Sequence, residues 1–215
     1  MTKTALLFGS TGMIGSYLLE ELLRNPEYDS VKIFVRKSLS LQHTKLKQII
    51  TDFHSLDRIS SEMNGDVIFS CLGTTVKNTP SKEGRRFIDY EIPVQLAAIA
   101  HTNKIPCMMV VSSVGASADS SNFYLRIKGE MEAAVSKSGV SQIVFMQPSF
   151  LLGSRNEVRA GEGLWTFISR IFSPLMFGRM RKYKPIHGLD VARTMIRLEG
   201  KLNGVSVVQF DEIKK

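Results

Sequence analysis

The sequence predicts an α/β fold in which one parallel sheet is doubly wound, with helices on both of its faces. Short apolar runs rich in Val, Ile and Phe show little alternation of apolar and polar residues, which is typical of strands that are covered on both sides. Longer segments of helical periodicity separate these runs almost to the end of the chain, as a series of strand–helix units requires. The chain has 215 residues, which is enough for one domain with a substantial core.

The expected elements follow this alternation. Strands are expected at residues 5–8, 31–35, 66–71, 107–112, 142–146 and 205–210, and a further strand is expected to end at Ile50. Helices are expected at residues 13–24, about 80–101, about 122–138 and about 189–198. Residues of about 153–185 interrupt the alternation, and we expect them to form a small C-terminal cap on the substrate side of a single domain, residues 1–215.

The composition narrows the class of protein. The chain has 28 Lys and Arg against 20 Asp and Glu, a net charge of +8, which favours anionic ligands or surfaces. It has no arginine-rich run and no basic helix with interleaved aromatic residues, so we expect a solvated basic surface and no nucleic-acid partner. The first eight residues are too short an apolar run for a signal peptide, and no run of about 20 apolar residues occurs. We therefore expect a cytoplasmic protein without membrane association.

The cysteines and histidines predict neither a disulfide nor a metal site. Cys71 and Cys107 are expected at opposite ends of adjacent parallel strands, roughly 15 Å apart at about 3.3 Å per residue, which is too far for a disulfide. The histidines stand at positions 43, 54, 101 and 187, and this spacing is not that of a metal-ligand set.

A glycine-rich loop follows the first expected strand and opens the first expected helix. Its glycines have the spacing G-x-x-G-x-x-G. Glycines allow the tight turn and let the backbone approach a pyrophosphate, while the helix N-terminus offers free N–H groups and partial positive charge. In this context the loop predicts a dinucleotide-binding domain of Rossmann type. The residues expected to hold the phosphates are Gly9, Ser10, Thr11, Gly12, Met13, Ile14 and Gly15.

The end of the second expected strand indicates which dinucleotide binds. NAD sites usually carry an Asp or Glu there, which holds the 2′-hydroxyl of the ribose. In this chain the strand leads into Arg36 and Lys37 instead. A carboxylate would repel a 2′-phosphate, whereas a guanidinium can bind it through two hydrogen bonds. The sequence therefore favours NADP(H) over NAD(H).

These motifs resemble those of the short-chain dehydrogenase/reductase superfamily, in an atypical branch, and the resemblance spans nearly the whole chain. Finer features are similar to the Tat-interacting-protein oxidoreductase branch. They are the residues Ser-Asn-Phe at 121–123, the residues Lys-Gly-Glu at 128–130 and the residues Gly-Glu at 161–162, which lead to Trp165. Proteins of that branch bind NADPH, so the resemblance implies the same cofactor here.

The resemblance also implies further cofactor contacts. Asp52 and Phe53 stand where an acidic residue and its neighbour contact the adenine in the superfamily. The turn after the strand at 66–71 lines the cofactor ribose, and the residues after the strand at 142–146 flank the nicotinamide. The residues concerned in this chain are Cys71, Leu72, Gly73, Thr74, Pro148, Ser149 and Phe150.

The catalytic residues implied by the resemblance are Ser113, Tyr124 and Lys128. Tyr124 and Lys128 form a YxxxK pair, and a second match, Tyr28 with Lys32, falls on a loop and the start of a strand. Tyr124 and Lys128 instead lie on an expected helix, capped by Ser120 or Ser121, where residues four apart project from one face.

The chemistry of reduction needs this arrangement. A free tyrosine has a pKa near 10, and a nearby ammonium lowers that pKa so that the phenol can exchange a proton at neutral pH. Ser113 would hydrogen-bond the substrate oxygen as it gains negative charge. Lys128 would also hold the nicotinamide ribose. Many superfamily members place an Asn in the preceding long helix to support a proton relay, whereas Asp89 stands nearest that position here.

The expected function is therefore an NADPH-dependent oxidoreductase that reduces a small-molecule carbonyl substrate. Two alternatives stay open: a regulatory protein that senses redox state by binding NADP(H) without significant turnover, and an enzyme of the epimerase or dehydratase type. The apolar and basic segment 163–184 has three possible roles. In order of preference, they are a cap over the substrate pocket, packing in a homodimer, and contact with an anionic membrane surface.

Overall fold

The computed structural model describes residues 2–152 and 183–214, which form a seven-stranded sheet and its flanking helices. The strands of this sheet are β1 (Lys3–Phe8), β2 (Tyr28–Val35), β3 (Leu46–Ile50), β4 (Val67–Ser70), β5 (Cys107–Val111), β6 (Gln142–Met146) and β9 (Gly204–Val208). The α-helices are α1 (Met13–Arg24), α2 (Lys82–Arg86), α3 (Ile92–Thr102), α4 (Phe123–Val135), α6 (Gly188–Leu198) and α7 (Phe210–Ile213). A 3₁₀ segment η1 (Leu56–Glu62), a π-helical segment η2 (Phe87–Glu91) and the short pair β7 (Leu151–Leu152) and β8 (Ile186–His187) complete the described elements.

All neighbouring strands of the large sheet are parallel, in the order β3-β2-β1-β4-β5-β6-β9. The chain runs outward from β1 to β3, and then crosses to β4 on the other side of β1. The order of the strands therefore reverses between β1 and β4, and in open α/β sheets ligands bind at such a point, outside the carboxyl ends of the strands. The doubly wound fold predicted from the sequence is confirmed.

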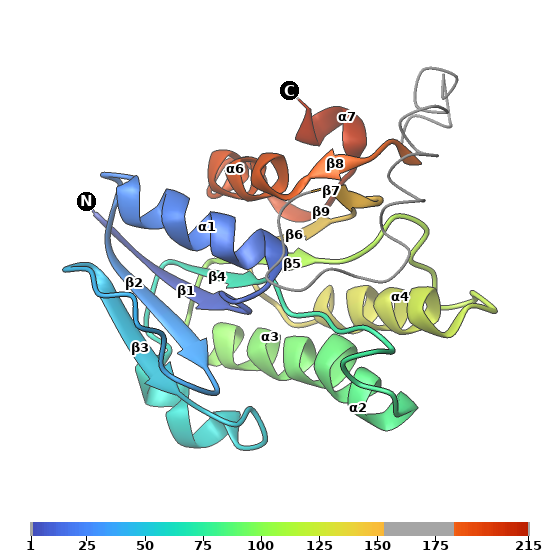
Figure 1. The fold of residues 1–215 in the computed structure, drawn as a ribbon, viewed down its shortest axis with the longest axis horizontal. Helices are drawn as coiled ribbons and strands as arrows, with labels where there is room; N and C mark the ends of the chain where they lie inside the picture. The colour runs from blue at the N-terminus through green and yellow to red at the C-terminus, as the bar shows by residue number, and fades with distance from the viewer. Residues whose placement is uncertain (1, 153–182, 215) are drawn as a thin grey trace.

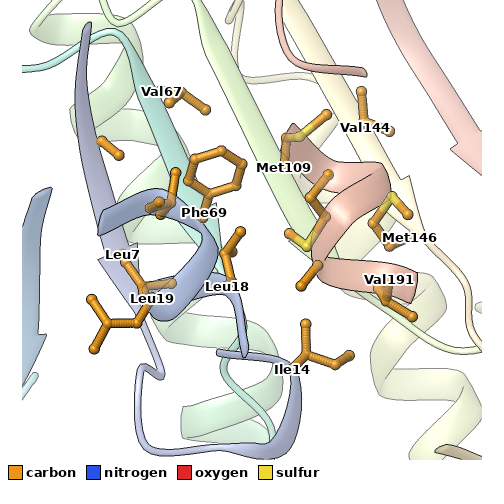
Figure 2. Close-up of a cluster of buried hydrophobic side chains, with 14 of the residues drawn as sticks. Leu7, Ile14, Leu18, Leu19, Val67, Phe69, Met109, Val144, Met146 and Val191 are labelled. Atoms are coloured by element: carbon orange, nitrogen blue, oxygen red, sulfur yellow. The ribbon is translucent and has the colours of Figure 1, made fainter. Parts of the chain in front are cut away.

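Helices cover both faces of the sheet, with α1 and α6 on one face and α3 and α4 on the other (Figure 1). Side chains of successive residues in β1 point to opposite faces of the sheet. Leu7 is buried in the core beneath α1 and α6, and Leu6 is buried in the core beneath α3 and α4. This alternation explains why the strands are apolar throughout. Figure 2 shows the first layer, where Leu18 of α1, Phe69 of β4 and Val191 of α6 are buried together.

Several element bounds differ from the expectation. The segment expected as one helix at about 80–101 is α2, η2 and α3 in succession, because one π-helical turn interrupts the α-helical hydrogen bonding. The strand expected at 205–210 ends at Val208, and Phe210 opens α7 instead. The strands expected at 66–71 and 107–112 are one or two residues shorter, and the helix expected at about 122–138 ends at Val135.

The prediction that Ser120 or Ser121 caps α4 is wrong. Asn122, rather than Ser120 or Ser121, precedes the helix, and its side-chain oxygen accepts hydrogen bonds from the backbone N–H groups of Tyr124 and Leu125 at 2.9 and 3.2 Å. Asn is as good a capping residue as Ser, so composition alone could not choose between adjacent candidates. The expected substrate-side cap, about 153–185, lies almost wholly outside the described residues, as does all but the end of segment 163–184.

Candidate functional site

The glycine loop lies between β1 and α1, at the point where the strand order reverses. Two of its glycines leave no room for a side chain: a Cβ at Gly9 would lie 2.6 Å from the Cys71 carbonyl oxygen, and a Cβ at Gly15 would lie 2.0 Å from the Gly9 carbonyl oxygen. Gly9 also has φ +84°, which favours glycine. The loop is therefore packed against the turn after β4, and the two predicted cofactor segments 9–15 and 71–74 are side by side.

The start of α1 is open to an anion. Gly12 precedes the helix with extended backbone and offers no side chain to cap it, so the first N–H groups of α1 keep their hydrogen-bonding capacity and the partial positive charge of the helix end. Within the loop the Ser10 hydroxyl is buried, at 2% exposure, and has no hydrogen-bond partner in the described part of the chain. A buried hydroxyl without a partner is rare in folded proteins, and a bound phosphate would supply the missing partner. The loop thus fits the pyrophosphate of a dinucleotide.

An open pocket of about 470 Å³ lies at the carboxyl ends of β2 and β3. Arg36 and Asp52, both predicted from the sequence, line it together. Lys37 and Phe53 are not among its lining residues: Lys37 is exposed, and the Phe53 side chain is buried in the core near Phe8. The remaining lining residues are Ile50, Thr51, Ser55, Arg58 and Ile59.

The turn after β4 holds the other predicted ribose-side residues. Cys71 donates its backbone N–H to the Phe8 carbonyl at 2.8 Å, and burial raises the pKa of its thiol to about 12. Such a thiol is protonated and unreactive at neutral pH, which supports a packing role for Cys71. The Thr74 hydroxyl is hydrogen-bonded to that of Thr79 at 2.8 Å. Gly73 faces Asp89, since a Cβ there would lie 3.5 Å from the Asp89 carboxylate.

Tyr124 and Lys128 lie one turn apart on α4, with very different surroundings. Tyr124 is 40% exposed, so its phenol is accessible, whereas Lys128 is only 2% exposed. The Lys128 ammonium lies 2.9 Å from the Asp89 carboxylate and donates to the Val111 carbonyl at 3.2 Å. Because Val111 ends β5, this contact fixes the lysine beside the strand that leads into Ser113.

The charge state of Lys128 depends on its neighbours. Burial by itself would lower its pKa, but the negative charge of Asp89 above all outweighs burial, and the pKa of Lys128 is raised. The lysine is therefore an ammonium at neutral pH, with Asp89 as its buried counter-ion. Asp89 comes from the π-helical segment η2, and such turns are frequent at functional sites.

Sequence reasoning noticed Asp89 but missed this ion pair, and it also missed Glu132. Glu132 follows Lys128 by four residues on α4, and it accepts hydrogen bonds from the Ser112 hydroxyl and, at 2.9 Å, from the Gln147 amide. It thereby ties α4 to the ends of β5 and β6. The spacing Tyr124, Lys128, Glu132 is a sequence signal for one helix face, but only the fold shows what that face meets.

The turns after β5 and β6 meet at the same edge. The backbone N–H of Val114 donates to the Pro148 carbonyl at 3.1 Å, which brings the segment of Ser113 beside residues 148–150. The Ser113 hydroxyl is 3.4 Å from the Val114 carbonyl, a weak contact that a better acceptor could replace. The Ser149 hydroxyl donates to the Lys184 carbonyl, and Phe150 is 58% exposed.

Residues 2–152 and 183–214 contain neither a metal-ligand cluster nor a membrane-spanning helix. No group of His, Cys, Asp or Glu in these residues could hold a metal ion, and both cysteines are free thiols. No helix in these two ranges is long and apolar enough to cross a membrane.

Comparison with known proteins identifies the family of this chain. A family model described as NAD(P)H-binding matches residues 9–163, so the chain belongs to that family, in the atypical branch of the short-chain dehydrogenase/reductase superfamily. It is 30% identical to the mitochondrial protein FMP52 of Saccharomyces cerevisiae over 95% of this chain and 91% of that protein. It is 31% identical to protein HTATIP2 of Rattus norvegicus over 75% of this chain and 68% of that protein.

Solved structures show the same fold. The Bordetella bronchiseptica enzyme WbmH, in complex with NAD⁺, superposes with a TM-score of 0.71 at 15% identity, over 96% of this chain and 75% of that chain. The UDP-N-acetylglucosamine 4-epimerase of Methanobrevibacter ruminantium superposes with a TM-score of 0.73 at 18% identity, over 97% of this chain and 76% of that chain. The Rossmann-type fold is thus shared with WbmH, which was solved with NAD⁺, and with this epimerase.

Proposed function

We propose that this NAD(P)-binding protein is an NADPH-dependent carbonyl reductase, with Tyr124 as the proton donor, Lys128 as the residue that tunes it and Ser113 as the residue that positions the substrate oxygen. The observation that carries the proposal is the buried, charged Lys128 one turn after the accessible Tyr124, both on the helix beside the end of β5. We propose the cytoplasm as its location, although the yeast relative is named mitochondrial.

Each residue has a role that follows from its position. Residues 9–15 would bind the pyrophosphate, Arg36 the 2′-phosphate and Asp52 the adenine. Residues 71–74 would line the cofactor ribose, and residues 148–150 would flank the nicotinamide. NADPH would supply a hydride to the carbonyl carbon. Tyr124 would give its phenolic proton to the carbonyl oxygen as negative charge develops there, and the product is an alcohol. The Ser113 hydroxyl would hydrogen-bond the same oxygen.

The Lys128 ammonium would favour this proton transfer because its positive charge stabilises the Tyr124 phenolate. Its ion pair with Asp89 keeps the ammonium charged in a buried site, but the carboxylate also offsets part of its field. A weaker field at Tyr124 would make proton transfer slower. The ion pair therefore favours a second candidate function, a redox-sensing protein that binds NADP(H) without significant turnover.

Replacement of Tyr124 separates these two functions. Tyr124→Phe keeps the ring and removes the proton donor, so NADPH affinity should change little while turnover of a small aldehyde or ketone falls by about two to four orders of magnitude. Turnover is followed by NADPH absorbance across a panel of carbonyl compounds. The control is Tyr28→Phe, which removes a phenol at the start of β2, at the opposite end of the sheet, and should leave the rate unchanged.

Undiminished turnover in Tyr124→Phe would refute the role of this residue. If the unmutated protein reduces no compound of a broad panel yet binds NADPH, the sensor becomes the better proposal. Partner binding that follows the redox state of the cofactor would then support it.

A further inference from the structure

Arg58 lines the same pocket as Arg36, although it belongs to no motif that the sequence analysis singled out. It comes from η1, the 3₁₀ segment after β3. Leu56, the first residue of η1, is 1% exposed in the core beneath α3, and the Arg58 backbone N–H donates to the Ser55 carbonyl at 3.1 Å. Burial of Leu56 therefore anchors η1 in the core, and Arg58 of this segment lines the pocket.

The turn between β3 and η1 brings the two arginines to one place. The Thr51 N–H donates to the Val35 carbonyl at 2.9 Å, which ties the end of β3 to the end of β2 just before Arg36. Phe53 then adopts φ +68°, a conformation uncommon for a residue other than glycine, and its side chain is buried. The chain turns there from β3 into η1, and Arg58 of η1 lines the same pocket as Arg36.

The surfaces of this pocket differ in chemistry. Ile50, which is 54% exposed, and Ile59 give it apolar walls, as the flat face of an adenine requires. Arg36 and Arg58 are both exposed, and neither guanidinium has an ion-pair partner in the part of the chain that the structure describes. Asp52 is the acidic residue that lines the pocket beside them. Two guanidinium groups without an ion-pair partner, beside apolar walls, form a site for an aromatic base that carries a phosphate.

We propose that Arg58 is a second specificity-determining residue, which binds the 2′-phosphate of NADPH together with Arg36. This inference rests on the proposed NADPH preference and deepens it. A phosphate dianion has oxygens for two guanidinium groups, and each forms charge-assisted hydrogen bonds with it. Removal of one arginine should therefore weaken the preference for a 2′-phosphate, and removal of both should abolish it.

Small ligands test the pocket without the rest of the cofactor. The full chain is titrated calorimetrically with 2′,5′-ADP and with 5′-AMP, which differ only in the 2′-phosphate. Arg58→Gln should weaken 2′,5′-ADP about tenfold, the scale of one charge-assisted hydrogen bond, and leave 5′-AMP unchanged. Arg58→Lys, which keeps the charge but lacks the planar fork, should recover part of the loss. Arg36→Gln combined with Arg58→Gln should make the two ligands bind equally.

Arg24→Gln is the matched control, since Arg24 is an exposed arginine that ends α1, away from this pocket. It should change neither affinity. An equal loss for both ligands in Arg58→Gln would overturn the proposal, because the residue would then act on the adenosine or on the shape of η1. Unchanged affinity for 2′,5′-ADP would overturn it as well.

The outcome for the proposed NADPH preference is separate. If the unmutated protein prefers 2′,5′-ADP and Arg36→Gln alone removes the whole preference, the proposed function survives and the role of Arg58 is refuted. If the unmutated protein binds 2′,5′-ADP and 5′-AMP equally, both fail.

Discussion

The two ends of the sheet contrast in how their polar groups are satisfied. At the amino ends of the strands, Lys3 is ion-paired with Glu199 at 2.5 Å, and the Tyr28 hydroxyl lies 3.5 Å from the same carboxylate. The Gln142 side chain donates to the Leu198 carbonyl and accepts from the Gly200 N–H. These groups satisfy one another, so this end of the sheet needs no ligand.

At the carboxyl ends of the strands, several polar and charged groups lack hydrogen-bond or ion-pair partners in the described residues. The start of α1 has no side-chain cap, and the buried hydroxyls of Ser10 and Ser70 have no hydrogen-bond partner in the described residues. Arg36 and Arg58 have no ion-pair partner there either. One end of the sheet is therefore built for stability, and the other is incomplete without an anionic ligand. Mutations at the two ends should separate folding from binding.

The largest effect is expected at the glycine loop. Gly12 has φ −80°, which any residue can adopt, and a Cβ there would lie 3.3 Å from the Gly9 carbonyl oxygen, a tight contact that a shift of a few tenths of an ångström relieves, so Gly12→Val should fold. Its branched side chain would stand where the pyrophosphate must approach, and NADPH binding, measured by calorimetry, should fall by at least about a hundredfold. A thermal shift by NADPH that persists in this variant would place the phosphates elsewhere.

Gly15→Ala should differ from Gly12→Val, because it should destabilise the fold as well as remove binding. A Cβ at Gly15 would lie only 2.0 Å from the Gly9 carbonyl oxygen, so this smaller substitution should lose the packing of α1 against the loop. We expect a lower melting temperature as well as loss of binding. An Ala variant as stable as the unmutated protein would contradict the close approach.

At the amino end we expect the opposite pattern. Glu199→Gln removes the charge of a buried carboxylate, of which the side chain is 6% exposed. Because Lys3 is a third exposed, the loss should be about 2 kcal/mol of unfolding free energy, below that of a fully buried pair. NADPH affinity should not change. Glu20→Gln, in the exposed pair with Arg24, is the control and should cost less than about 0.5 kcal/mol. A change of NADPH affinity in Glu199→Gln would remove the distinction between the two ends.

The next prediction concerns the preference for NADPH over NADH, which depends on Arg36. In the unmutated protein NADPH should bind more tightly than NADH by about 1–3 kcal/mol, the scale of charge-assisted hydrogen bonds. Arg36→Asp should reverse or abolish that preference, because a carboxylate repels the 2′-phosphate and can accept from the 2′-hydroxyl. Calorimetry with both cofactors measures it, and equal affinities in the unmutated protein would refute the assignment to NADP(H).

The smallest effect is a dependence on pH. The hydrogen bond to Glu199 raises the pKa of Lys3 above its ordinary value of 10.5. The stability conferred by the pair is therefore fully present below pH 10.5, and is lost as the pH rises through the raised lysine pKa. Denaturant titrations at pH 8 and near pH 11 should show the difference between the unmutated protein and Glu199→Gln narrowing at the higher pH. A difference that widens would contradict this sign.

The fold could be predicted because its signals are local. The apolar run 142–146 and the helical periodicity of 13–24 give β6 and α1 with the expected bounds, since strand and helix periods follow from side-chain geometry. The π-helical turn at η2 has no such signal, because it leaves the apolar periodicity on either side intact. No helix is predicted at α7, because the apolar Phe210 extends the pattern of the last strand beyond Gln209.

The site could be predicted only where a motif marks it. The loop 9–15, Arg36 and the Tyr124–Lys128 pair follow from spacing and context. Arg58 carries no signal in the sequence, since its relevance depends on the turn at Phe53, after which η1 contributes Arg58 to the pocket that Arg36 lines. The pairing of Asp89 with Lys128 joins residues 39 positions apart across two helices, which no local pattern encodes.

Hydrogen exchange with and without saturating NADPH tests the contrast between the two ends most directly. We predict slower exchange of backbone amides at residues 9–15, 36–37, 51–59 and 71–74, all at the carboxyl ends of the strands, because ligand contacts and loop ordering suppress local opening. Amides at residues 140–142 and 199–204, at the amino ends, should exchange as before. Protection centred on the amino ends, or no protection anywhere at saturating NADPH, would contradict the account.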